Sequence, residues 1–374
     1  MKITDSIKFR SGKTLKFRVA QSPMVTQGAN VDGTISQENL DYYGARSEVA
    51  GAVIVEACYV HETGKGFAKQ IGVSSDEHIE GLSKLATAIK KDGALAIMQI
   101  YHGGRETVTA YDNLGYALAP SAIDYEFLNY PIREITEAEI EEIIKAYGQA
   151  ARRAYEAGFD GVEIHGANHY LIQEFFSEFS NKREDKWGGS LENRMRFPLE
   201  VTREVKRVVA TFENEFLVGY RISPEEIHGE NFGYDYKQSK ALVAELVKEN
   251  LDYIHISNFG NFDMGPADLA QSFAEIYKEV MDEETQLLTV GSIFKEEDVN
   301  KALSITDIAV IGRAALLDPQ FTKKIVEGRA DEINHEMSVE IMDYIKLPKG
   351  LYDWYKSGIP LPPLPNMEEV IAEK

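Results

Sequence analysis

Cysteine is almost absent from this chain. The sequence of 374 residues contains a single cysteine, Cys58. One cysteine excludes an internal disulfide, a zinc site made of cysteines alone and a four-cysteine iron–sulfur cluster. It is typical of proteins from a reducing compartment.

Positive charge is also scarce. The chain has 40 Lys and Arg against 61 Asp and Glu, a formal net charge of −21. Such a field repels the phosphates of nucleic acids and anionic lipids, so we expect no nucleic-acid partner. No run approaches about eighteen uncharged apolar residues, and Met1–Asp5 lacks the basic-then-apolar pattern of a signal peptide. We therefore expect a soluble cytoplasmic protein with no membrane association.

Short apolar runs alternate with amphipathic segments along almost the whole chain. Several runs are apolar continuously, which is typical of parallel strands covered on both faces. The predicted strands are Phe17–Ala20, Ala52–Ala57, Leu95–Ile100, Gly161–His165, Phe216–Ser223, Tyr253–Ser257, Gln286–Gly291 and Asp307–Gly312. No Gly-x-Gly-x-x-Gly motif follows any of them, which disfavours an open dinucleotide-binding sheet. Eight βα units in a row predict an α/β protein with a (β/α)8 TIM barrel.

The clearest predicted helix spans Glu137–Ala157. Thr136 and Glu139 have the spacing of a capping box, and Gly158 supplies a left-handed exit. The other predicted helices are Ile79–Lys91, Pro198–Val209, Lys237–Glu249, Asp268–Met281, Glu296–Leu303 and Pro319–Glu327. These segments supply the crossovers that parallel strands require.

The chain is longer than a minimal barrel of roughly 250 residues, and the surplus can be located. We expect an N-terminal β-hairpin around residues 11–13, and long loops over Glu106–Ile135 and Ala167–Ser190, after strands three and four. Loops of this length at the catalytic mouth are typical of binding loops. We expect residues 1–334 to form the barrel and residues 335–374 a C-terminal extension packed on it. Its prolines, Pro360, Pro362, Pro363 and Pro365, predict an extended segment.

Chemistry in a TIM barrel is built at the C-terminal ends of the strands. Arg221 lies inside an apolar strand, where a guanidinium needs an anion to offset its desolvation. Gly291 and Gly312 follow strands seven and eight, and Arg313 is adjacent. This arrangement suits a phosphate site, although ordinary loop glycines give the same pattern.

Several longer motifs add to this pattern in order along the chain. They are Gly161–His165, Tyr170–Phe175, Ser180–Arg194, Ile311–Arg313 and Asp318–Pro319. Together they resemble the old yellow enzyme family, which comprises FMN-dependent (β/α)8-barrel reductases of activated alkenes. The resemblance covers about residues 7–327. It implies an NADH:flavin oxidoreductase, or ene-reductase, that binds FMN and takes electrons from NADH or NADPH.

The resemblance also implies a cofactor cradle. The backbone of Pro23, Met24 and Val25, with Ala57, lines the flavin ring, Gln99 binds its pyrimidine edge, and Arg221 lies near N1 and C2=O. The phosphate is held by Gly291, Gly312 and Arg313. The family commonly has Thr or Cys at the position of Val25, and Thr26 comes one place later. Which of the two side chains faces flavin O4 stays open at this point.

The remaining roles concern the acceptor. The resemblance implies that His165 and Asn168 grip the substrate carbonyl, that Tyr170 protonates the α-carbon, and that Tyr101 forms a wall of the substrate pocket. The implied partner is a small electrophilic alkene or a related acceptor, whose identity the sequence does not specify. The helical exterior of a barrel is compatible with a monomer or a homo-oligomer.

Two rival functions follow from the same residues. The spacing of His165 and His169 invites a metal-dependent TIM-barrel hydrolase with Glu163 as a third group. Because the pair leaves a strand and lacks the Glu of His-Glu-x-x-His, we expect no metal. A flavin-binding protein without turnover, such as a sensor, is the second rival.

Overall fold

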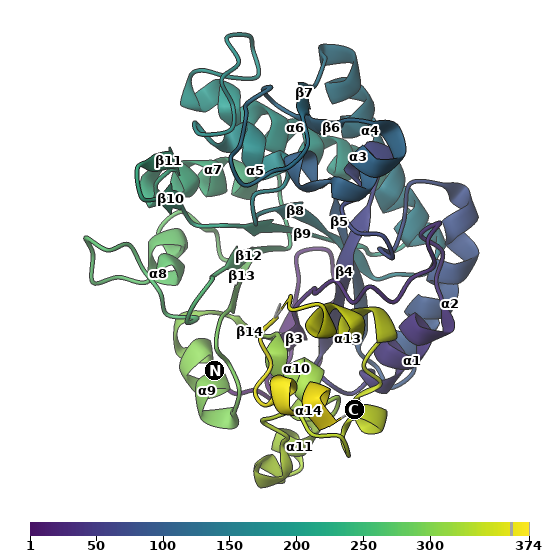
Figure 1. The fold of residues 1–374 in the computed structure, drawn as a ribbon. Helices are drawn as coiled ribbons and strands as arrows, with labels where there is room; N and C mark the ends of the chain where they lie inside the picture. The colour runs from purple at the N-terminus through teal and green to yellow at the C-terminus, as the bar shows by residue number, and fades with distance from the viewer. Residues whose placement is uncertain (360–361, 374) are drawn as a thin grey trace.

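Eight parallel strands form a closed barrel at the centre of the molecule (Figure 1). The computed structural model describes residues 1–359 and 362–373. The barrel strands are β3 (Val19–Gln21), β4 (Ala52–Tyr59), β5 (Leu95–Tyr101), β8 (Gly161–Gly166), β9 (Leu217–Ile222), β12 (Tyr253–Ser257), β13 (Gln286–Val290) and β14 (Ile308–Ile311). They follow one another around the barrel in chain order, and β14 pairs with β3 to close it. The predicted (β/α)8 fold and all eight of its strands are confirmed.

The predicted helices surround this barrel. They are α2 (Ile79–Lys90), α4 (Glu137–Glu156), α6 (Leu191–Val209), α7 (Tyr236–Lys248), α8 (Phe273–Lys278), α9 (Glu296–Ile305) and α11 (Phe321–Val326). Thr136 and Glu139 form the expected capping box at the start of α4. Helix α6 begins earlier than expected because Ser190 caps it, and Pro198 is accommodated inside it. Helix α8 is shorter than expected because its cap is Ser272.

Further elements decorate the two ends of the barrel. The predicted hairpin is confirmed as β1 (Ile7–Lys8) paired with β2 (Thr14–Leu15). The loop after β5 contains α3 (Val108–Leu114), β6 (Ala117–Ala119) and β7 (Ile132–Glu134), and the loop after β8 contains α5 (Leu171–Phe176). Outside these two loops, four further elements were not predicted from the sequence. They are α1 (Gln37–Ala45), β10 (Glu226–His228), β11 (Asn231–Tyr234) and α10 (Arg313–Leu317). Most of them are too short to show hydrophobic periodicity.

The barrel interior is filled with side chains and is not a pore. Ile54, Ile97 and Leu288 belong to its lower layers, together with Tyr253. A Cβ atom on Gly219 would lie 2.0 Å from the ring of Tyr253, so the glycine makes room for this large side chain. The filled lower layers leave the upper layer for polar residues, which is where the candidate site lies.

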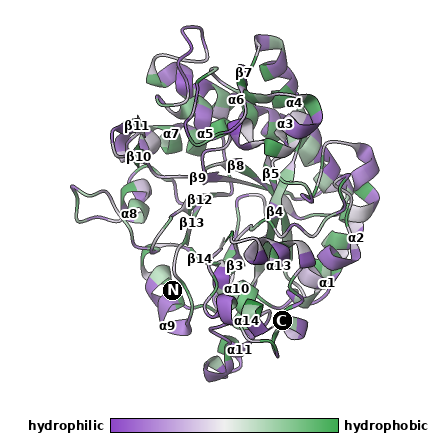
Figure 2. Ribbon diagram, in the orientation of Figure 1, coloured by the Kyte–Doolittle hydropathy of each residue, from purple (hydrophilic) through white to green (hydrophobic). Residues whose placement is uncertain are grey.

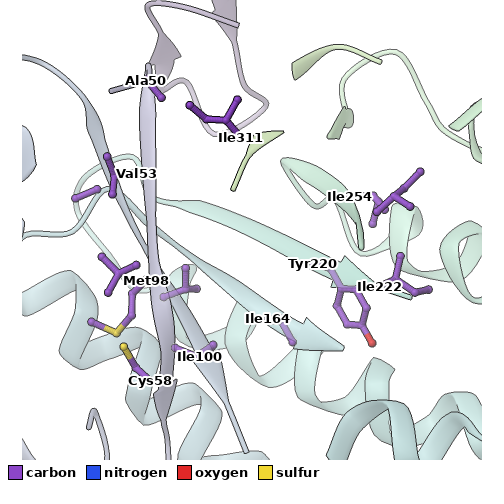
Figure 3. Close-up of a cluster of buried hydrophobic side chains, with 14 of the residues drawn as sticks. Ala50, Val53, Cys58, Met98, Ile100, Ile164, Tyr220, Ile222, Ile254 and Ile311 are labelled. Atoms are coloured by element: carbon purple, nitrogen blue, oxygen red, sulfur yellow. The ribbon is translucent and has the colours of Figure 1, made fainter. Parts of the chain in front are cut away.

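A second core lies between the strands and the helices. Figure 3 shows part of it, with Val53, Met98, Ile164, Ile222, Ile254 and Ile311 pointing out of the barrel strands. The surrounding helices carry both hydrophobic and hydrophilic stretches (Figure 2), as amphipathic crossovers do. The strands are thus covered on both faces, which explains their continuously apolar sequences.

About half of the described residues of the C-terminal extension are helical, so the expectation of an extended tail was wrong. It contains α12 (Met342–Ile345), α13 (Lys349–Lys356) and α14 (Met367–Glu373). The prolines Pro362, Pro363 and Pro365 fall in the connection between α13 and α14, whereas Pro360 lies outside the described residues. The helices are explained by apolar residues that precede the prolines in the sequence. Of these, Ile345, Leu351 and Tyr355 are buried in the outer core. The boundary at residue 334 stays a prediction.

Among the described residues, none of the helices has the length and apolar character needed to span a lipid bilayer.

Candidate active site

A polar layer crosses the barrel interior just below the mouth. Gln99, Arg221 and His255 point inward, because each lies an even number of residues beyond an apolar interior residue of its strand. Glu163 points inward as well, because its carboxylate contacts Gln99 and His255. The Nε2 atom of Gln99 donates to Glu163 Oε1 at 2.7 Å. The Nδ1 atom of His255 lies 2.9 Å from the other carboxylate oxygen. Side chains from β5 and β12 thus meet on a single buried carboxylate of β8, which neighbours β5 and is separated from β12 by β9 alone.

Of the two titratable neighbours Glu163 and His255, the surroundings favour the charged form of Glu163 and the neutral form of His255. Burial alone would raise the pKa of Glu163, but His255, Arg221 and Gln99 favour its charged form and the net direction is downward. Burial lowers the pKa of His255, partly opposed by Glu163. We conclude that Glu163 is a carboxylate beneath the Arg221 guanidinium and that His255 is neutral, with Nδ1–H donating to Glu163.

A hydrogen-bond chain leads from this layer to the mouth. Arg221 Nη2 donates to Ser257 Oγ at 3.1 Å, and Asn168 Nδ2 donates to the same oxygen at 3.1 Å. The backbone N–H of Asn168 donates to Ser223 Oγ at 3.0 Å. These contacts hold Asn168 in a left-handed conformation, with φ of 59°. An amide nitrogen has two hydrogens and Ser257 takes one, so a second donor of Asn168 remains.

His165 is a neutral donor at the end of β8. Burial lowers the pKa of its imidazole well below the usual range, and the charge of Arg221 adds to this effect. The backbone N–H of Ala167 donates to its Nδ1 atom at 3.4 Å. Because Nδ1 accepts, we assign the imidazole proton to Nε2. His165 therefore presents one N–H group without carrying a charge.

Aromatic and aliphatic residues pack beside these donors; Val25 and Tyr170 are partly exposed at the mouth, whereas Tyr101 is fully buried. Tyr101 and Ala57 form one apolar cluster, against which Val25 and Tyr170 pack. The Tyr170 ring lies edge-on to both Tyr101 and His165, with centroid distances of 4.5 and 5.1 Å. Partial burial, with the charge of Glu106, raises the pKa of Tyr170 to about 12. Its hydroxyl therefore keeps its proton at neutral pH.

Met24 and the three residues predicted to hold the phosphate, Gly291, Gly312 and Arg313, lie on the part of the rim formed by the ends of β3, β13 and β14. A Cβ atom on Gly312 would lie no closer than 3.7 Å to Met24 Sδ, so this glycine is not required by the packing of the chain. Gly291 has a φ of 148°, and a Cβ atom there would lie 2.6 Å from the carbonyl oxygen of Gly260. Arg313 stacks on Phe294 at 4.7 Å from the ring centroid. Pro23 is buried in the turn that leads to Met24.

Thr26 does not share the mouth with Val25. The Thr26 hydroxyl donates to Glu56 Oε1 at 2.6 Å, and its backbone N–H donates to Glu56 Oε2 at 3.2 Å. Its side chain is fully buried, whereas Val25 is partly exposed and packs on the apolar cluster of the mouth. Of the two alternatives left open by the sequence, the structure favours Val25 as the residue at the mouth.

The three residues of the rival metal site do not converge. His169 Nε2 lies 3.0 Å from His228 Nε2, and Glu163 is engaged by Gln99 and His255. In the part of the chain that the structure describes, no group of three or more His, Cys, Asp or Glu side chains could hold a metal ion. The geometry therefore gives the hydrolase hypothesis no support.

Sequence reasoning missed three contributors to the site. The sequence suggests Glu163 only as a metal ligand, and it assigns no role to His255 or Ser257. His255 and Ser257 could have been identified from the alternation of side chains along β12. This alternation places both on the interior face with Tyr253. Glu163 could have been identified because a buried Arg221 needs a nearby anion, and Glu163 is a carboxylate on the neighbouring strand β8.

The donor set fits a flavin mononucleotide. Arg221 Nε is buried and finds no acceptor among the described residues, so the guanidinium can bind an electron-rich edge of a ligand. Gln99 keeps its carbonyl oxygen and one N–H beyond its contact with Glu163. The space at Gly312, beside the guanidinium of Arg313, suits a phosphate.

Comparisons with known proteins agree with this fit. The NADH:flavin oxidoreductase / NADH oxidase family matches residues 2–332. A probable NADH-dependent flavin oxidoreductase of Bacillus subtilis, YqiG, is 40% identical over 351 residues, 92% of this chain and 93% of the relative. An NADH:acrylate oxidoreductase of Vibrio harveyi is 39% identical over 352 residues, 91% of this chain but 34% of that longer protein.

A solved structure extends the agreement to the fold. The old yellow enzyme homologue of Zymomonas mobilis superposes with a TM-score of 0.79 at 25% identity, over 93% of this chain and 99% of that one. The chain therefore belongs to the NADH:flavin oxidoreductase / NADH oxidase family, the old yellow enzymes, and is an FMN-dependent, NAD(P)H-linked flavin oxidoreductase.

Proposed function

We propose that this enzyme reduces activated alkenes, such as α,β-unsaturated carbonyl compounds, at the mouth of the barrel. The observation that carries this proposal is the convergence of a neutral imidazole N–H, a free amide N–H and a protonated phenol on one rim. These groups belong to His165, Asn168 and Tyr170. The name of the Vibrio harveyi relative, an NADH:acrylate oxidoreductase, supports an alkene as acceptor.

His165 and Asn168 polarise the acceptor. Addition of hydride to the β-carbon of an enone moves negative charge onto the carbonyl oxygen. Two fixed N–H donors stabilise that charge, by roughly 3 to 4 kcal/mol each in comparable oxyanion sites. Both donors are held before the substrate arrives: Ala167 fixes the tautomer of His165, and Ser223 with Ser257 fixes Asn168. The donors therefore need little reorganisation during the reaction.

Tyr170 supplies the proton that completes the reduction. Its raised pKa keeps the phenol protonated, and the edge-on contact with Tyr101 and His165 fixes its ring. A positioned general acid contributes typically 10²–10⁴-fold to a rate. We assign Val25 to the apolar wall that confines the alkene and Tyr101, which is buried in the same cluster, to the support of that wall.

The cofactor is assigned to the polar layer and the adjacent rim. Gln99 and Arg221 would bind the pyrimidine edge, the backbone of Pro23, Met24 and Val25 with Ala57 would line the ring, and Gly291, Gly312 and Arg313 would hold the phosphate. Bound FMN supplies the hydride, which comes from NADH or NADPH. The cation of Arg221 stabilises negative charge that develops on an adjacent acceptor.

The test is anaerobic oxidation of NADH or NADPH by the FMN-loaded protein with cyclohexenone and with acrylate. We expect oxidation of the nicotinamide to depend on one of these alkenes, with the saturated product formed in equal amount. Reduction of the bound FMN without consumption of either alkene would instead favour a flavin protein without turnover. The variant Asn168→Ala, with one donor removed, should lose about 10²-fold in alkene turnover and little in FMN reduction.

A further inference from the structure

Glu56 is a fully buried carboxylate next to the turn that lines the mouth. It lies in β4 immediately before Ala57. Both of its oxygens accept hydrogen bonds from Thr26, one from the hydroxyl at 2.6 Å and one from the backbone N–H at 3.2 Å. Thr26 directly follows Val25, so the carboxylate fixes the end of the turn formed by residues 23–25.

Helix α1 also holds the carboxylate, through Tyr43. The Tyr43 hydroxyl donates to Glu56 Oε1 at 3.3 Å and accepts the backbone N–H of Glu56 at 3.0 Å. Side chain and backbone of Glu56 are therefore both anchored to the same phenol. The result is a buried connection from α1 through Glu56 and Thr26 to the residues that face the mouth.

We propose that Glu56 is a positioning residue for the cofactor, acting through Thr26 on the backbone of residues 23–25. This inference rests on the proposed assignment of Pro23, Met24 and Val25 to the flavin ring. The carboxylate touches neither the ring nor the acceptor. Its function is to satisfy two donors of one residue, which fixes the direction of the Val25–Thr26 peptide.

Among the titratable groups of the described residues that pack around Glu56, none other than Glu56 itself is expected to change its protonation state near neutral pH. Burial raises the pKa of Tyr42, Tyr43 and Cys58, so all three stay neutral. The Arg46 guanidinium stacks on Tyr42 at 3.6 Å and donates to backbone carbonyls of α1, α10 and α12. Burial also raises the pKa of Glu56 to about 7, against the hydrogen bonds from Thr26 and Tyr43. The strength of its hold on Thr26 is therefore expected to change near neutral pH.

Two pairs of variants separate the role of hydrogen bonding from that of charge. Glu56→Met removes both acceptors, whereas Glu56→Gln keeps one acceptor and can donate to the Thr26 hydroxyl. Thr26→Val removes the hydroxyl, and Thr26→Ser keeps it. The readouts are the Kd of FMN and the ratio of reduced to oxidised FMN in equilibrium with a redox dye. Neither readout needs an alkene.

We expect Glu56→Met and Thr26→Val each to weaken FMN binding about fivefold and to shift the redox ratio, the scale of one ordinary hydrogen bond. Glu56→Gln and Thr26→Ser should stay near wild type. The double variant Glu56→Met/Thr26→Val should be no worse than Glu56→Met, because the two residues act as one unit. Proton uptake by FMN makes the redox ratio depend on pH in every variant, and Glu56→Gln should lack only the additional change near pH 7 that Glu56 contributes.

Glu174→Met is the matched control. Glu174 is also fully buried and also accepts a backbone N–H, that of Arg105 at 2.8 Å, but it does not touch the turn. The inference is overturned if Thr26→Val and Glu56→Met leave both readouts unchanged, or if Glu174→Met changes them equally. A wild-type protein that binds FMN but reduces no alkene would refute the proposed function and leave this comparison intact.

Discussion

The side-chain amide of Gln99 donates to the carboxylate of Glu163 at 2.7 Å inside the barrel. This contact decides which way the amide faces, because a carboxylate accepts and never donates. The nitrogen is turned toward Glu163, and the carbonyl oxygen is left for another donor. A ligand that offers an N–H group next to an acceptor can therefore be read by Gln99 in a single orientation.

Glu163→Gln is expected to damage both folding and cofactor binding. The substitution leaves Arg221 without its buried counter-charge and lets Gln99 rotate. A buried cation left without compensation costs about 3 to 5 kcal/mol, so the free energy of unfolding should fall by that order in urea titrations. FMN affinity should fall as well. Glu297→Gln, in an exposed contact with Lys301, should change stability by less than about 0.5 kcal/mol.

Tyr170→Phe should separate the two halves of the catalytic cycle. Reduction of FMN by NADH should keep its rate, because the phenol has no part in it. Reoxidation by cyclohexenone should slow by about 10²-fold or more, because the proton donor is lost. Stopped-flow measurement of both halves decides the matter, and an equal loss in the first half would remove Tyr170 from the role of acid.

The phosphate assignment can be tested with two glycines that differ in their surroundings. Gly312→Ala should fold normally, because its Cβ would meet nothing closer than 3.7 Å. It should nevertheless bind FMN about tenfold more weakly, since close approach of a phosphate to the backbone would be blocked. Riboflavin, which lacks the phosphate, should bind both proteins alike. Equal weakening of riboflavin would place the phosphate elsewhere.

Gly291→Ala is the contrasting case. The substituted Cβ would lie 2.6 Å from the carbonyl oxygen of Gly260, a backbone atom that cannot move alone. We expect a loss of stability of about 1 to 3 kcal/mol in the absence of any flavin. A melting temperature equal to that of Gly312→Ala would contradict the packing argument.

The barrel could be predicted from sequence because its strands are buried on both faces. Runs such as Ile54 and its neighbours are continuously apolar, and the capping box at Thr136 marks the start of α4 without ambiguity. The tail could not be predicted in the same way. Its prolines dominated the local signal, whereas the helices of the tail depend on burying Ile345 and Leu351 against distant parts of the chain.

The candidate site likewise contains residues that local sequence predicts and residues whose role depends on distant parts of the chain. Residues at strand ends, such as His165 and Arg221, follow from their place in the alternation. The partners that fix their state do not, because the contact of Glu163 with His255 joins residues 92 positions apart. Whether Thr26 or Val25 faces the mouth likewise depends on Glu56, 30 positions further along the chain.

The pH dependence of stability should be governed in part by His102. Burial, with a contribution from His61, lowers the pKa of His102 from 6.5 to about 3. The Nδ1 atom accepts the backbone N–H of Gly104 at 3.1 Å, and Nε2 lies 3.0 Å from Thr63 Oγ1. A proton on Nδ1 would therefore displace a donor. The folded protein resists protonation, whereas the unfolded chain takes up a proton below about pH 6.5.

Stability supplied by neutral His102 is fully present above pH 6.5 and is lost as the pH falls toward 3, because the unfolded state then binds more protons. Between pH 6.5 and pH 5 the loss amounts to about 2 kcal/mol for this one group. Urea titrations at both pH values should show a shallower dependence in His102→Gln. The exposed His335→Gln should keep the wild-type dependence, and an unchanged slope in His102→Gln would mean that other groups carry the acid sensitivity.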